Sequence, residues 1–423
     1  MPRDILISAG EASGDRYATM LVEELRRRWP DTRFFGCAGP RMRRAGVEPV
    51  IEAESLAVVG LVEVLEHLPR IWGEYRKLVS AASARSPELA ILTDSPDFHL
   101  PLARKLAKQG VPVVYLVAPQ VWAWRKGRIR GMRRTIRKLL CIFPFEEPFF
   151  RANGVSACNI GHPLAGVVRP SFEKAEFFRK HRLAPSRQLV TLLPGSRKGE
   201  AARHLPALVE AAQRIYGQQA THFVLPASET TGAQFFAGRT GTAPIQVIEG
   251  ETWDAIAHAD VALAASGTVT VEAALVGTPM VTFYKVNALS WLLGRLLVRV
   301  PFYSMVNLVA EREIVPELMQ TAMTGECLAG DGPICLVGKS VRVQRCHQRH
   351  LMTRTPFGMP ANEGKRVRSQ RPAGGDAHNG IQQLTAMALR LNCKFVVHGV
   401  AVLGAFLAQQ FERATPDFLS AAF

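Results

Sequence analysis

The sequence predicts an α/β protein with two Rossmann-like domains that face each other across a cleft. The chain has 423 residues, which is too many for one ordinary hydrophobic core, and 48% of them are hydrophobic. Short apolar runs alternate with stretches of helical period, as in parallel sheets that helices cover on both faces. The alternation occurs twice, in residues 1–168 and 187–320, on either side of a charged linker at 169–186.

The first domain, residues 1–168, contains five apolar runs that we expect as buried strands. Each is apolar at both alternating positions and ends in small or turn residues. A helix is expected after the first run, because four large side chains follow one another at i, i+4, i+8 and i+12. These side chains are Tyr17, Leu21, Leu25 and Trp29. The five runs are ILISAG (5–10), TRFFGCAG (32–39), ELAILTDSP (88–96), VPVVYLVAP (111–119) and KLLCIFP (138–144).

The stretch SAGEASGD, residues 8–15, follows the first expected strand and is made mostly of small residues. Ligands of open parallel sheets bind beyond the carboxyl ends of the strands, so we expect this stretch to form one wall of the cleft. It lacks the G-x-G-x-x-G motif, and its carboxylates would repel a pyrophosphate. Glu11 and Asp15 are better suited to sugar hydroxyls, and Asp15 could instead cap the helix that it precedes.

Two further carboxylates follow the third strand, in LTDSPDF (92–98). Asp94 ends the strand and Asp97 follows a proline. A pair of acids at the cleft suits general base catalysis together with substrate orientation. Capping of the next helix is the alternative for Asp97.

The second domain, residues 187–320, repeats the pattern of buried strands. Two of its strands end in turns that suit phosphate groups, because free N–H groups at a helix N-terminus bind anions. The first turn has Gly195, Ser196 and Arg197, and an ordinary turn with a solvated arginine is its alternative. The second has Ser266, Gly267 and Thr268, with Glu272 one helical turn later. Together they suggest a nucleotide diphosphate. The strands are expected in LVTLLPGS (189–196), THFVLPAS (221–228), IQVIEG (245–250), VALAAS (261–266) and PMVTFY (279–284).

The formal net charge of +16 points to an anionic partner, either nucleic acid, an anionic membrane or a phosphorylated substrate. Trp122 and Trp124 precede eight basic residues between Arg125 and Lys138, a combination found in nucleic-acid and membrane-surface binders alike. Residues 288–303 are strongly apolar and could lie in a bilayer interface, line an acyl groove or form a core helix. No run is long and apolar enough to span a bilayer.

Residues 321–423 differ from the rest of the chain, because much of this tail has neither strand nor helix period. We expect it to be disordered or poorly specified. Its cysteines and histidines, Cys335, Cys346, His347 and His350, fit no standard metal spacing, so no metal site is expected. The other cysteines show no tight pairs, and no secretory signal precedes them, which favours a reduced, cytoplasmic compartment.

The ordered motifs of residues 4–320 closely resemble those of bacterial lipid-A-disaccharide synthases. Ten stretches occur in one order, which makes a chance match very improbable. They are SAGEASGD, FFGCAGPRM, LAVVGLVEVL, TDSPDF, APQVWAWR, FPFE, GHPLA, LLPGSR followed by Glu200, ASGT followed by Glu272, and MVNLVAEREIVPELMQ.

The resemblance implies an inverting glycosyltransferase of the GT-B fold. Its donor would be UDP-2,3-diacylglucosamine and its acceptor 2,3-diacylglucosamine 1-phosphate (lipid X). The products would be the β-1,6-linked disaccharide 1-phosphate and UDP. The resemblance implies no cofactor, no metal and no nucleic-acid partner, and it is compatible with a homodimer. The enzyme would be cytoplasmic and peripherally associated with the anionic surface of the inner membrane.

The resemblance also implies roles for individual residues. Asp94 would be the catalytic base, with Glu11 as the second choice, and burial should raise its pKa. Arg197 and the two small turns would hold the diphosphate. Glu272 would take the ribose, and Asn307 and Gln320 would close the donor site. The acceptor and lipid side would comprise Ser13, Asp15, Asp97, Trp122, Trp124 and Arg125.

Two other functions fit the sequence. One is another UDP-sugar enzyme of the same fold, such as an N-acetylglucosaminyltransferase or an epimerase. The other is an inactive lipid- or nucleotide-binding relative. The tail keeps the second open, because the resemblance ends after Gln320. We hypothesise a frameshift there, and an uninterrupted reading frame confirmed in transcript and peptide data would refute it.

Overall fold

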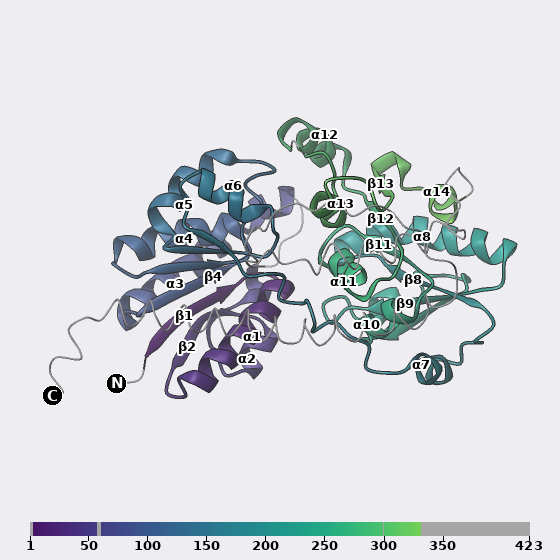
Figure 1. Ribbon diagram of the computed structural model, residues 1–423, viewed down its shortest axis with the longest axis horizontal. Coiled ribbons are helices and arrows are strands. Elements are labelled where there is room, and N and C mark those ends of the chain that lie inside the picture. The colour runs from purple at the N-terminus through teal and green to yellow at the C-terminus, as the bar shows by residue number, and fades with distance from the viewer. Residues whose placement is uncertain (1–2, 57–60, 299, 331–423) are drawn as a thin grey trace, which may run out of the picture.

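The computed structural model describes residues 3–56, 61–298 and 300–330, which form two α/β domains side by side (Figure 1). For the tail beyond Gly330 we expected disorder or a frameshift. The structure tests neither expectation, because residues 331–423 lie outside the described part. The tail cysteines and histidines lie outside it too. In the described ranges, no helix is long and apolar enough to cross a membrane.

The first domain is built on a parallel sheet whose strands run in the order β3-β2-β1-β4-β5-β6-β7, counted over the described residues. The five expected strands are β1, β2, β4, β5 and β6. Two more, β3 and β7, were not expected and lie at the edges of the sheet. The strands are β1 (Asp4–Ala9), β2 (Arg33–Ala38), β3 (Glu48–Glu52), β4 (Leu89–Thr93), β5 (Val113–Leu116), β6 (Lys138–Cys141) and β7 (Ala157–Asn159).

Helices cover both faces of this sheet and bury two apolar clusters against it. The predicted face of α1 packs against one side of the sheet, where Tyr17, Leu21 and Leu25 are buried. Helices α3, α4 and α5 contribute to the cluster on the other side. The helices are α1 (Ala12–Arg28), α2 (Pro40–Arg44), η1 (Ala53–Leu56), α3 (Leu61–Arg85), α4 (Pro96–Lys108), η2 (Lys126–Arg128), α5 (Ile129–Thr135) and α6 (Glu146–Ala152).

The second domain repeats the topology, with a parallel sheet in the order β10-β9-β8-β11-β12-β13 over the described residues. All five expected strands are present. The edge strand β13 was not expected. The strands are β8 (Gln188–Leu193), β9 (Thr221–Ala227), β10 (Ile245–Glu249), β11 (Val261–Ala265), β12 (Met280–Tyr284) and β13 (Glu317–Met319). The helices are α7 (Lys174–Lys180), α8 (Lys198–Gln218), α9 (Ala233–Phe236), α10 (Thr252–His258), α11 (Thr268–Val276), α12 (Ala288–Leu297), α13 (Met305–Ala310), η3 (Gln320–Ala322) and α14 (Gly325–Ala329).

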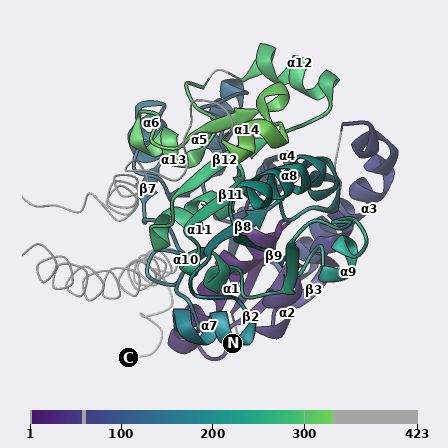
Figure 2. The same cartoon turned by 90° about the vertical axis from the view of Figure 1, so that its right-hand side faces the viewer.

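The segments next to the second domain pack onto it. Helix α7 lies in the expected linker, and its Phe177 and Phe178 are buried in a cluster of the second domain. The chain also continues in ordered form past Gln320, where α14 packs beside α8 (Figure 2). There Met323 and Leu328 are buried in the same cluster as α8.

Each sheet has one point where the strand order reverses, and this is where open α/β sheets bind ligands. In the first domain the point lies between β1 and β4, because Ala9 pairs with Thr93. In the second it lies between β8 and β11, where Leu193 pairs with Ala264. The motifs singled out from the sequence follow these four strands directly.

The two domains are in direct contact through apolar and charged side chains. Val271 and Leu275 of α11 join a cluster whose other buried members belong to the first domain. Beside them, Arg16 of α1 forms an ion pair with Glu272 of α11 at 3.2 Å. The contact brings the ligand-binding ends of both sheets to the same junction.

A glycine in β2 provides a test of how tightly the first sheet is packed. A Cβ atom added to Gly36 would lie 2.0 Å from the carbonyl oxygen of Ile7 in β1. Gly36→Ala should therefore lower the free energy of unfolding by about 3 kcal/mol or more, measured by urea denaturation. Gly73→Ala is the matched control, because nothing lies within 4 Å of its added Cβ on α3. Equal stability of the two variants would contradict this packing.

Candidate active site

The site begins with an unusual backbone at Asp94. Asp94 and Ser95 have φ angles of 51° and 36°, in the left-handed region, which costs a non-glycine residue about 1 kcal/mol or more. The carbonyl oxygen of Asp94 accepts a hydrogen bond from the Tyr115 hydroxyl at 2.5 Å and lies 3.0 Å from Nδ1 of His99. These buried partners hold the turn in place.

The carboxylate of Asp94 packs against the small residues of SAGEASGD and accepts hydrogen bonds from amides of this stretch. Its Oδ1 accepts from the Gly10 amide at 2.8 Å and its Oδ2 from the Glu11 amide at 3.1 Å. A Cβ atom on Gly14 would lie 1.6 Å from Oδ2. We expected this stretch to form a wall of the cleft, and the group that approaches its glycines closely is the chain's own carboxylate.

The environment of Asp94 makes it a much stronger base than an ordinary aspartate. Burial raises its pKa to about 8, and the nearby charge of Glu11 adds to the shift, while the amide hydrogen bonds oppose it. His99 is fully buried, and burial lowers its pKa to about 4, so its ring is neutral near pH 7. Its Nε2 lies 2.7 Å from Oγ of Ser8, so His99 positions the turn rather than supplying charge.

Glu11 and Arg197 meet at the junction of the two domains. Nη2 of Arg197 lies 2.9 Å from Oε2 of Glu11, and its Nη1 lies 3.2 Å from Oε1 of Glu200. Gly195 precedes Arg197 with a φ of 116°, and an added Cβ would lie 3.1 Å from Oε2 of Glu200. The turn therefore needs glycine, and it presents the half-exposed guanidinium of Arg197 to the first domain.

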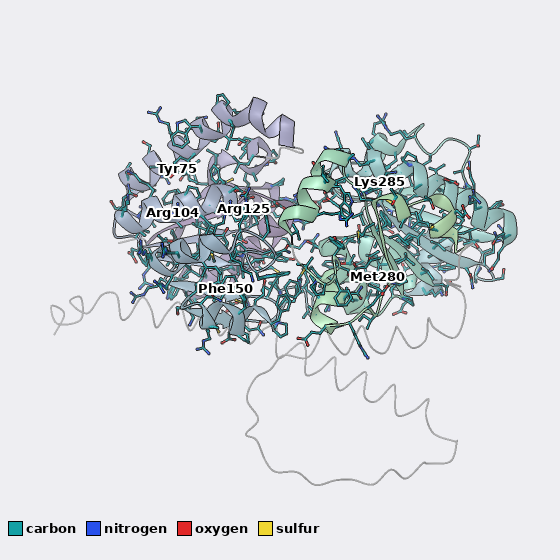
Figure 3. All side chains as sticks on the ribbon, turned by 90° about the horizontal axis from the view of Figure 1, so that it is seen from above. Tyr75, Arg104, Arg125, Phe150, Met280 and Lys285 are labelled. Carbon is teal, nitrogen blue, oxygen red and sulfur yellow. The ribbon has the colours of Figure 1, made fainter. Side chains whose placement is uncertain are left out.

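A buried histidine that the sequence did not reveal holds this turn. Nδ1 of His204 lies 2.7 Å from the carbonyl oxygen of Pro194, and Nε2 accepts from the Lys285 amide at 3.0 Å. His204 thus links the start of the turn to the end of β12. Figure 3 labels Lys285 on the second domain. A histidine inside an amphipathic helix gives no sequence signal for this role, because both partners are distant backbone groups.

The second expected phosphate turn lies at the N-terminus of α11. Oγ of Ser266 donates to the carbonyl oxygen of Tyr303 at 3.1 Å, and both Gly267 and Thr268 are exposed. An added Cβ on Gly267 would have no atom within 4 Å. Open space therefore lies beside the first N–H groups of the helix.

Glu272, one turn into α11, is paired across the domain junction. Its carboxylate accepts from Arg16 at 3.2 Å and from Nε1 of Trp253 at 3.1 Å. The guanidinium of Arg16 also lies 5.3 Å from the centre of the Trp253 ring. Arg16 and Trp253 could not be predicted from the sequence, because neither belongs to a recognisable motif.

Asn307 and Gln320 are bound to the backbone of the second domain. The Asn307 amide accepts from the N–H groups of Ile314 and Val315 and donates to Glu317 at 2.8 Å. The Gln320 amide pairs with both backbone groups of Val286. Both side chains therefore hold loops of the second domain in place.

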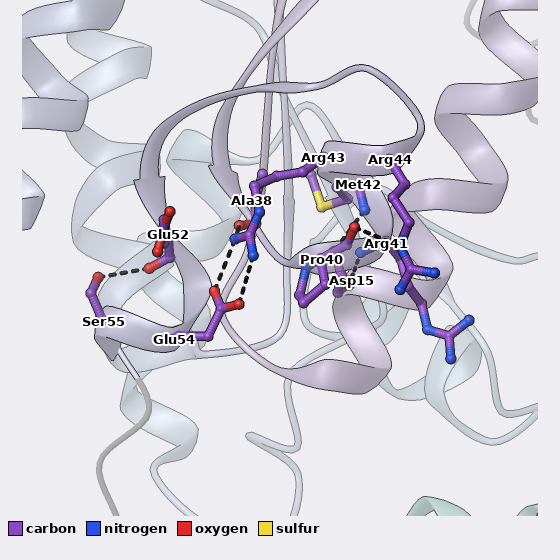
Figure 4. Close-up of polar contacts among 10 residues, drawn as sticks. All are labelled: Asp15, Ala38, Pro40, Arg41, Met42, Arg43, Arg44, Glu52, Glu54 and Ser55. Carbon is purple, nitrogen blue, oxygen red and sulfur yellow. Dashed lines mark hydrogen bonds and ion pairs between the residues drawn. The ribbon is translucent and has the colours of Figure 1, made fainter. Parts of the chain in front are cut away.

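Asp15 caps the second helix and not the helix that it precedes. Its carboxylate accepts from the amides of Arg41 and Met42 at 2.9 and 3.0 Å, at the N-terminus of α2 (Figure 4). The expectation that it caps α1 is wrong, because Asp15 lies inside the first turns of α1. Asp15 is buried, and its carboxylate is occupied by these two amides. Ser13 is half-buried on the same helix.

The other residues of the predicted acceptor side gather around α4 and the loop after β5. Asp97 forms ion pairs with Arg125 and Arg128. The guanidinium of Arg125 lies 4.0 Å from the centre of the Trp124 ring. Nε1 of Trp122 donates to the buried carboxyl of Glu146 at 3.3 Å. Burial raises the pKa of Glu146 to about 7.

Comparison with known proteins identifies the family of this chain. The family model described as lipid-A-disaccharide synthetase matches residues 5–356. The chain belongs to this family. The match extends beyond Gln320, where the resemblance of individual motifs ends.

Curated members of the lipid-A-disaccharide synthase family are similar over most of their length. The chain is 67% identical over 338 residues to the lipid-A-disaccharide synthase of Solibacter usitatus, covering 80% of this chain and 88% of that protein. It is 44% identical over 336 residues to that of Acidobacterium capsulatum, covering 76% and 84%.

Solved structures confirm the fold expected for a lipid-A-disaccharide synthase family member. The calicheamicin glycosyltransferase CalG4 aligns with a TM-score of 0.53 at 15% identity, covering 83% of this chain and 94% of that chain. A structure described as a UDP-N-acetylglucosamine 2-epimerase from Listeria monocytogenes aligns with a TM-score of 0.56 at 12% identity, covering 82% and 91%. The family member is thus a glycosyltransferase of the two-domain GT-B fold.

The raised pKa of Asp94 predicts a pH-dependent cost in stability for this family member. Between about pH 4 and pH 8 the folded protein keeps a proton that the unfolded chain releases, so stability falls as pH rises through this window. Asp94→Asn removes that loss. We expect the variant to gain several degrees in melting temperature over wild type at pH 8, and little at pH 4.5. Asp31→Asn, an exposed carboxylate of the same domain, is the control. A gain that is the same at both pH values would argue against a protonated Asp94.

Proposed function

We propose that this glycosyltransferase moves 2,3-diacylglucosamine from UDP-2,3-diacylglucosamine to the 6-hydroxyl of 2,3-diacylglucosamine 1-phosphate (lipid X). The products are the β-1,6-linked disaccharide 1-phosphate and UDP, with inversion at the anomeric carbon. The observation that supports this best is the junction at Glu11, whose N–H donates to Asp94 and whose carboxylate pairs with Arg197 of the second domain. Asp94 is a largely buried carboxyl group with a pKa of about 8. Asp94 is suited to take a proton and Arg197 to hold a departing diphosphate.

In the proposed reaction Asp94 takes the proton of the acceptor hydroxyl as the hydroxyl oxygen attacks the anomeric carbon of the donor. The bond between that carbon and the diphosphate oxygen breaks, and its electron pair leaves with UDP. A base with a pKa near the working pH is more effective than an ordinary aspartate, provided that enough of it is ionised. Every step is carried by side chains of this chain and by the two substrates.

On the donor side, Arg197 and the N-terminal turns of α8 and α11 would bind the diphosphate. Charge builds up on the diphosphate as the bond breaks, and a fixed guanidinium stabilises that change. Gly195, Ser196, Ser266, Gly267 and Thr268 would let it approach the backbone closely. Glu272 would take the ribose hydroxyls, while Asn307 and Gln320 hold the surrounding loops.

The arriving diphosphate would have to compete with Glu11, which occupies the Arg197 guanidinium at 2.9 Å. Once displaced, the Glu11 carboxylate would be left without that cation, beside Asp94. Its charge already adds to the raised pKa of Asp94. Donor binding would therefore strengthen the base.

On the acceptor side, the two tryptophans and the basic segment at 125–138 would contact the acceptor lipid and the anionic surface of the inner membrane on its cytoplasmic face. The apolar segment at 288–303 would contact acyl chains. Leu292 and Tyr303 in that segment are 59% and 44% exposed. The proposed function is compatible with a homodimer, and light scattering with in-line chromatography measures the assembly.

The purified full-length chain tests the proposed reaction directly. We expect UDP release only when UDP-2,3-diacylglucosamine and lipid X are both present, and none after Asp94→Ala, although UDP still binds. UDP release with a different acceptor, or epimerisation of a UDP-sugar, would identify another UDP-sugar enzyme. Binding of UDP without turnover would identify an inactive relative.

The pH dependence of the rate tests the coupling between Glu11 and Asp94. Because the base must be ionised, kcat/KM should rise with pH and level off above about pH 8. Glu11→Gln removes a negative charge, which lowers the pKa of Asp94 and moves this rise to lower pH. Glu88→Gln, an exposed site that precedes β4, should leave the profile unchanged. A rise at the same pH in the Glu11 variant and wild type would exclude the coupling.

A further inference from the structure

We propose that Arg125 and Arg128 bind the phosphate monoester of the acceptor, with Asp97 holding the two guanidinium groups together before the substrate arrives. The inference rests on the proposed function, because it assigns one group of the proposed acceptor to named side chains.

The geometry of the cluster is that of a site for an oxyanion. Nη1 of Arg125 donates to Oδ1 of Asp97 at 2.6 Å, and Nη2 of Arg128 donates to the same oxygen. Two guanidinium groups thus converge on one carboxylate oxygen. Arginine forms strong paired hydrogen bonds with phosphate as well as with carboxylate, so a phosphate could take over this position.

The backbone and the Trp124 ring fix one of these arginines. Arg125 has a φ of 57°, a left-handed conformation that is uncommon for a side chain of its size. Its guanidinium lies 4.0 Å from the centre of the Trp124 ring, which favours a cation. Arg128, at the end of η2, is only 21% exposed. A partly buried and oriented arginine is better prepared to bind than a solvated one.

Charge balance favours a phosphate monoester as the ligand. Two guanidinium groups face one carboxylate, which leaves a net positive charge on the cluster. Arg104 of α4 lies beside α5, because a Cβ on Gly131 would lie 2.8 Å from Nη2 of Arg104. Figure 3 labels Arg104 and Arg125 on the first domain. A phosphate monoester carries between one and two negative charges near pH 7, more than a phosphodiester.

The cluster also lies close to the base, as a sugar phosphate requires. Asp97 stands in the first turn of α4, directly after the turn that carries Asp94. The Tyr115 hydroxyl, which hydrogen-bonds to the Asp94 carbonyl, is also within electrostatic reach of Arg128 and Asp97. The reacting hydroxyl and the phosphate of the acceptor are separated by one sugar ring. A site beside the base, and not on the donor domain, suits that spacing.

Kinetics with two acceptors test the assignment. In neutral detergent, Arg128→Ala and Arg125→Ala should raise KM for lipid X by about 10- to 100-fold and leave KM for the donor unchanged. With 2,3-diacylglucosamine, which lacks the phosphate, wild type and variants should have similar KM values. Lys108→Ala, at the other end of α4, is the control for loss of one positive charge. Equal losses with both acceptors, or an unchanged KM for lipid X, would overturn the assignment.

A binding measurement separates this inference from the proposed reaction. We expect glucosamine 1-phosphate to raise the melting temperature of wild type more than glucosamine does, and Arg128→Ala to abolish the difference. This result would support the site even if no sugar were transferred to either acceptor, an outcome that would refute the proposed function alone. No difference in wild type would overturn the site. If the variants lost binding to vesicles of anionic phospholipid while KM for lipid X was unchanged, the arginines would serve the membrane and the inference would fail.

Discussion

The first domain is organised around one largely buried carboxyl group, that of Asp94, which lies beneath the amides of Gly10 and Glu11. A carboxylate removed from water is costly unless hydrogen bonds replace its hydration. Two amides supply such bonds at 2.8 and 3.1 Å, and they can do so only because β1 and β4 are neighbours. The room for the carboxylate depends on the missing Cβ of Gly14. Strand order, loop composition and the left-handed backbone at Asp94 together position this group.

The partial compensation of the ionised form is what would make Asp94 an effective base. If more donors surrounded Asp94, its pKa would fall toward the ordinary value and it would be a weak base. With burial dominant and Glu11 nearby, the pKa rises to about 8. The cost is borne by the surrounding fold, where His99, Tyr115 and Ser8 hold the strained turn without supplying a charge of their own. A functional carboxylate can therefore be distinguished from a structural one. Asp15 accepts hydrogen bonds from two amides in the same way, but its oxygens close the N-terminal end of α2.

Sequence reasoning predicted the interior of both sheets, because strands buried on two faces are continuously apolar. It missed β3, β7 and β13, which are edge strands and carry polar residues, as in the EPVIE of β3. Asp94 and Arg197 could be proposed because each follows a buried strand at a predictable place. The partners of Asp15 and Glu272 could not, since they depend on how helices and domains meet. The role of His204 could not be predicted for the same reason, because its contacts are backbone atoms far away in the sequence.

Charge around the domain junction links the two halves of the proposed reaction. Glu11 belongs to the first domain and lies between the Asp94 amide site and Arg197 of the second. While Glu11 is paired with Arg197, the guanidinium is occupied and the charge of Glu11 beside Asp94 is partly neutralised. A donor diphosphate would replace Glu11 on the guanidinium and return its charge to the surroundings of Asp94, so the base would be strengthened when a leaving group is in place. The positive cluster on Asp97 belongs to the first domain, so the proposed acceptor phosphate and donor diphosphate would be bound by different arginines. Two anionic substrates could then bind in one cleft, because different arginines would neutralise the acceptor phosphate and the donor diphosphate.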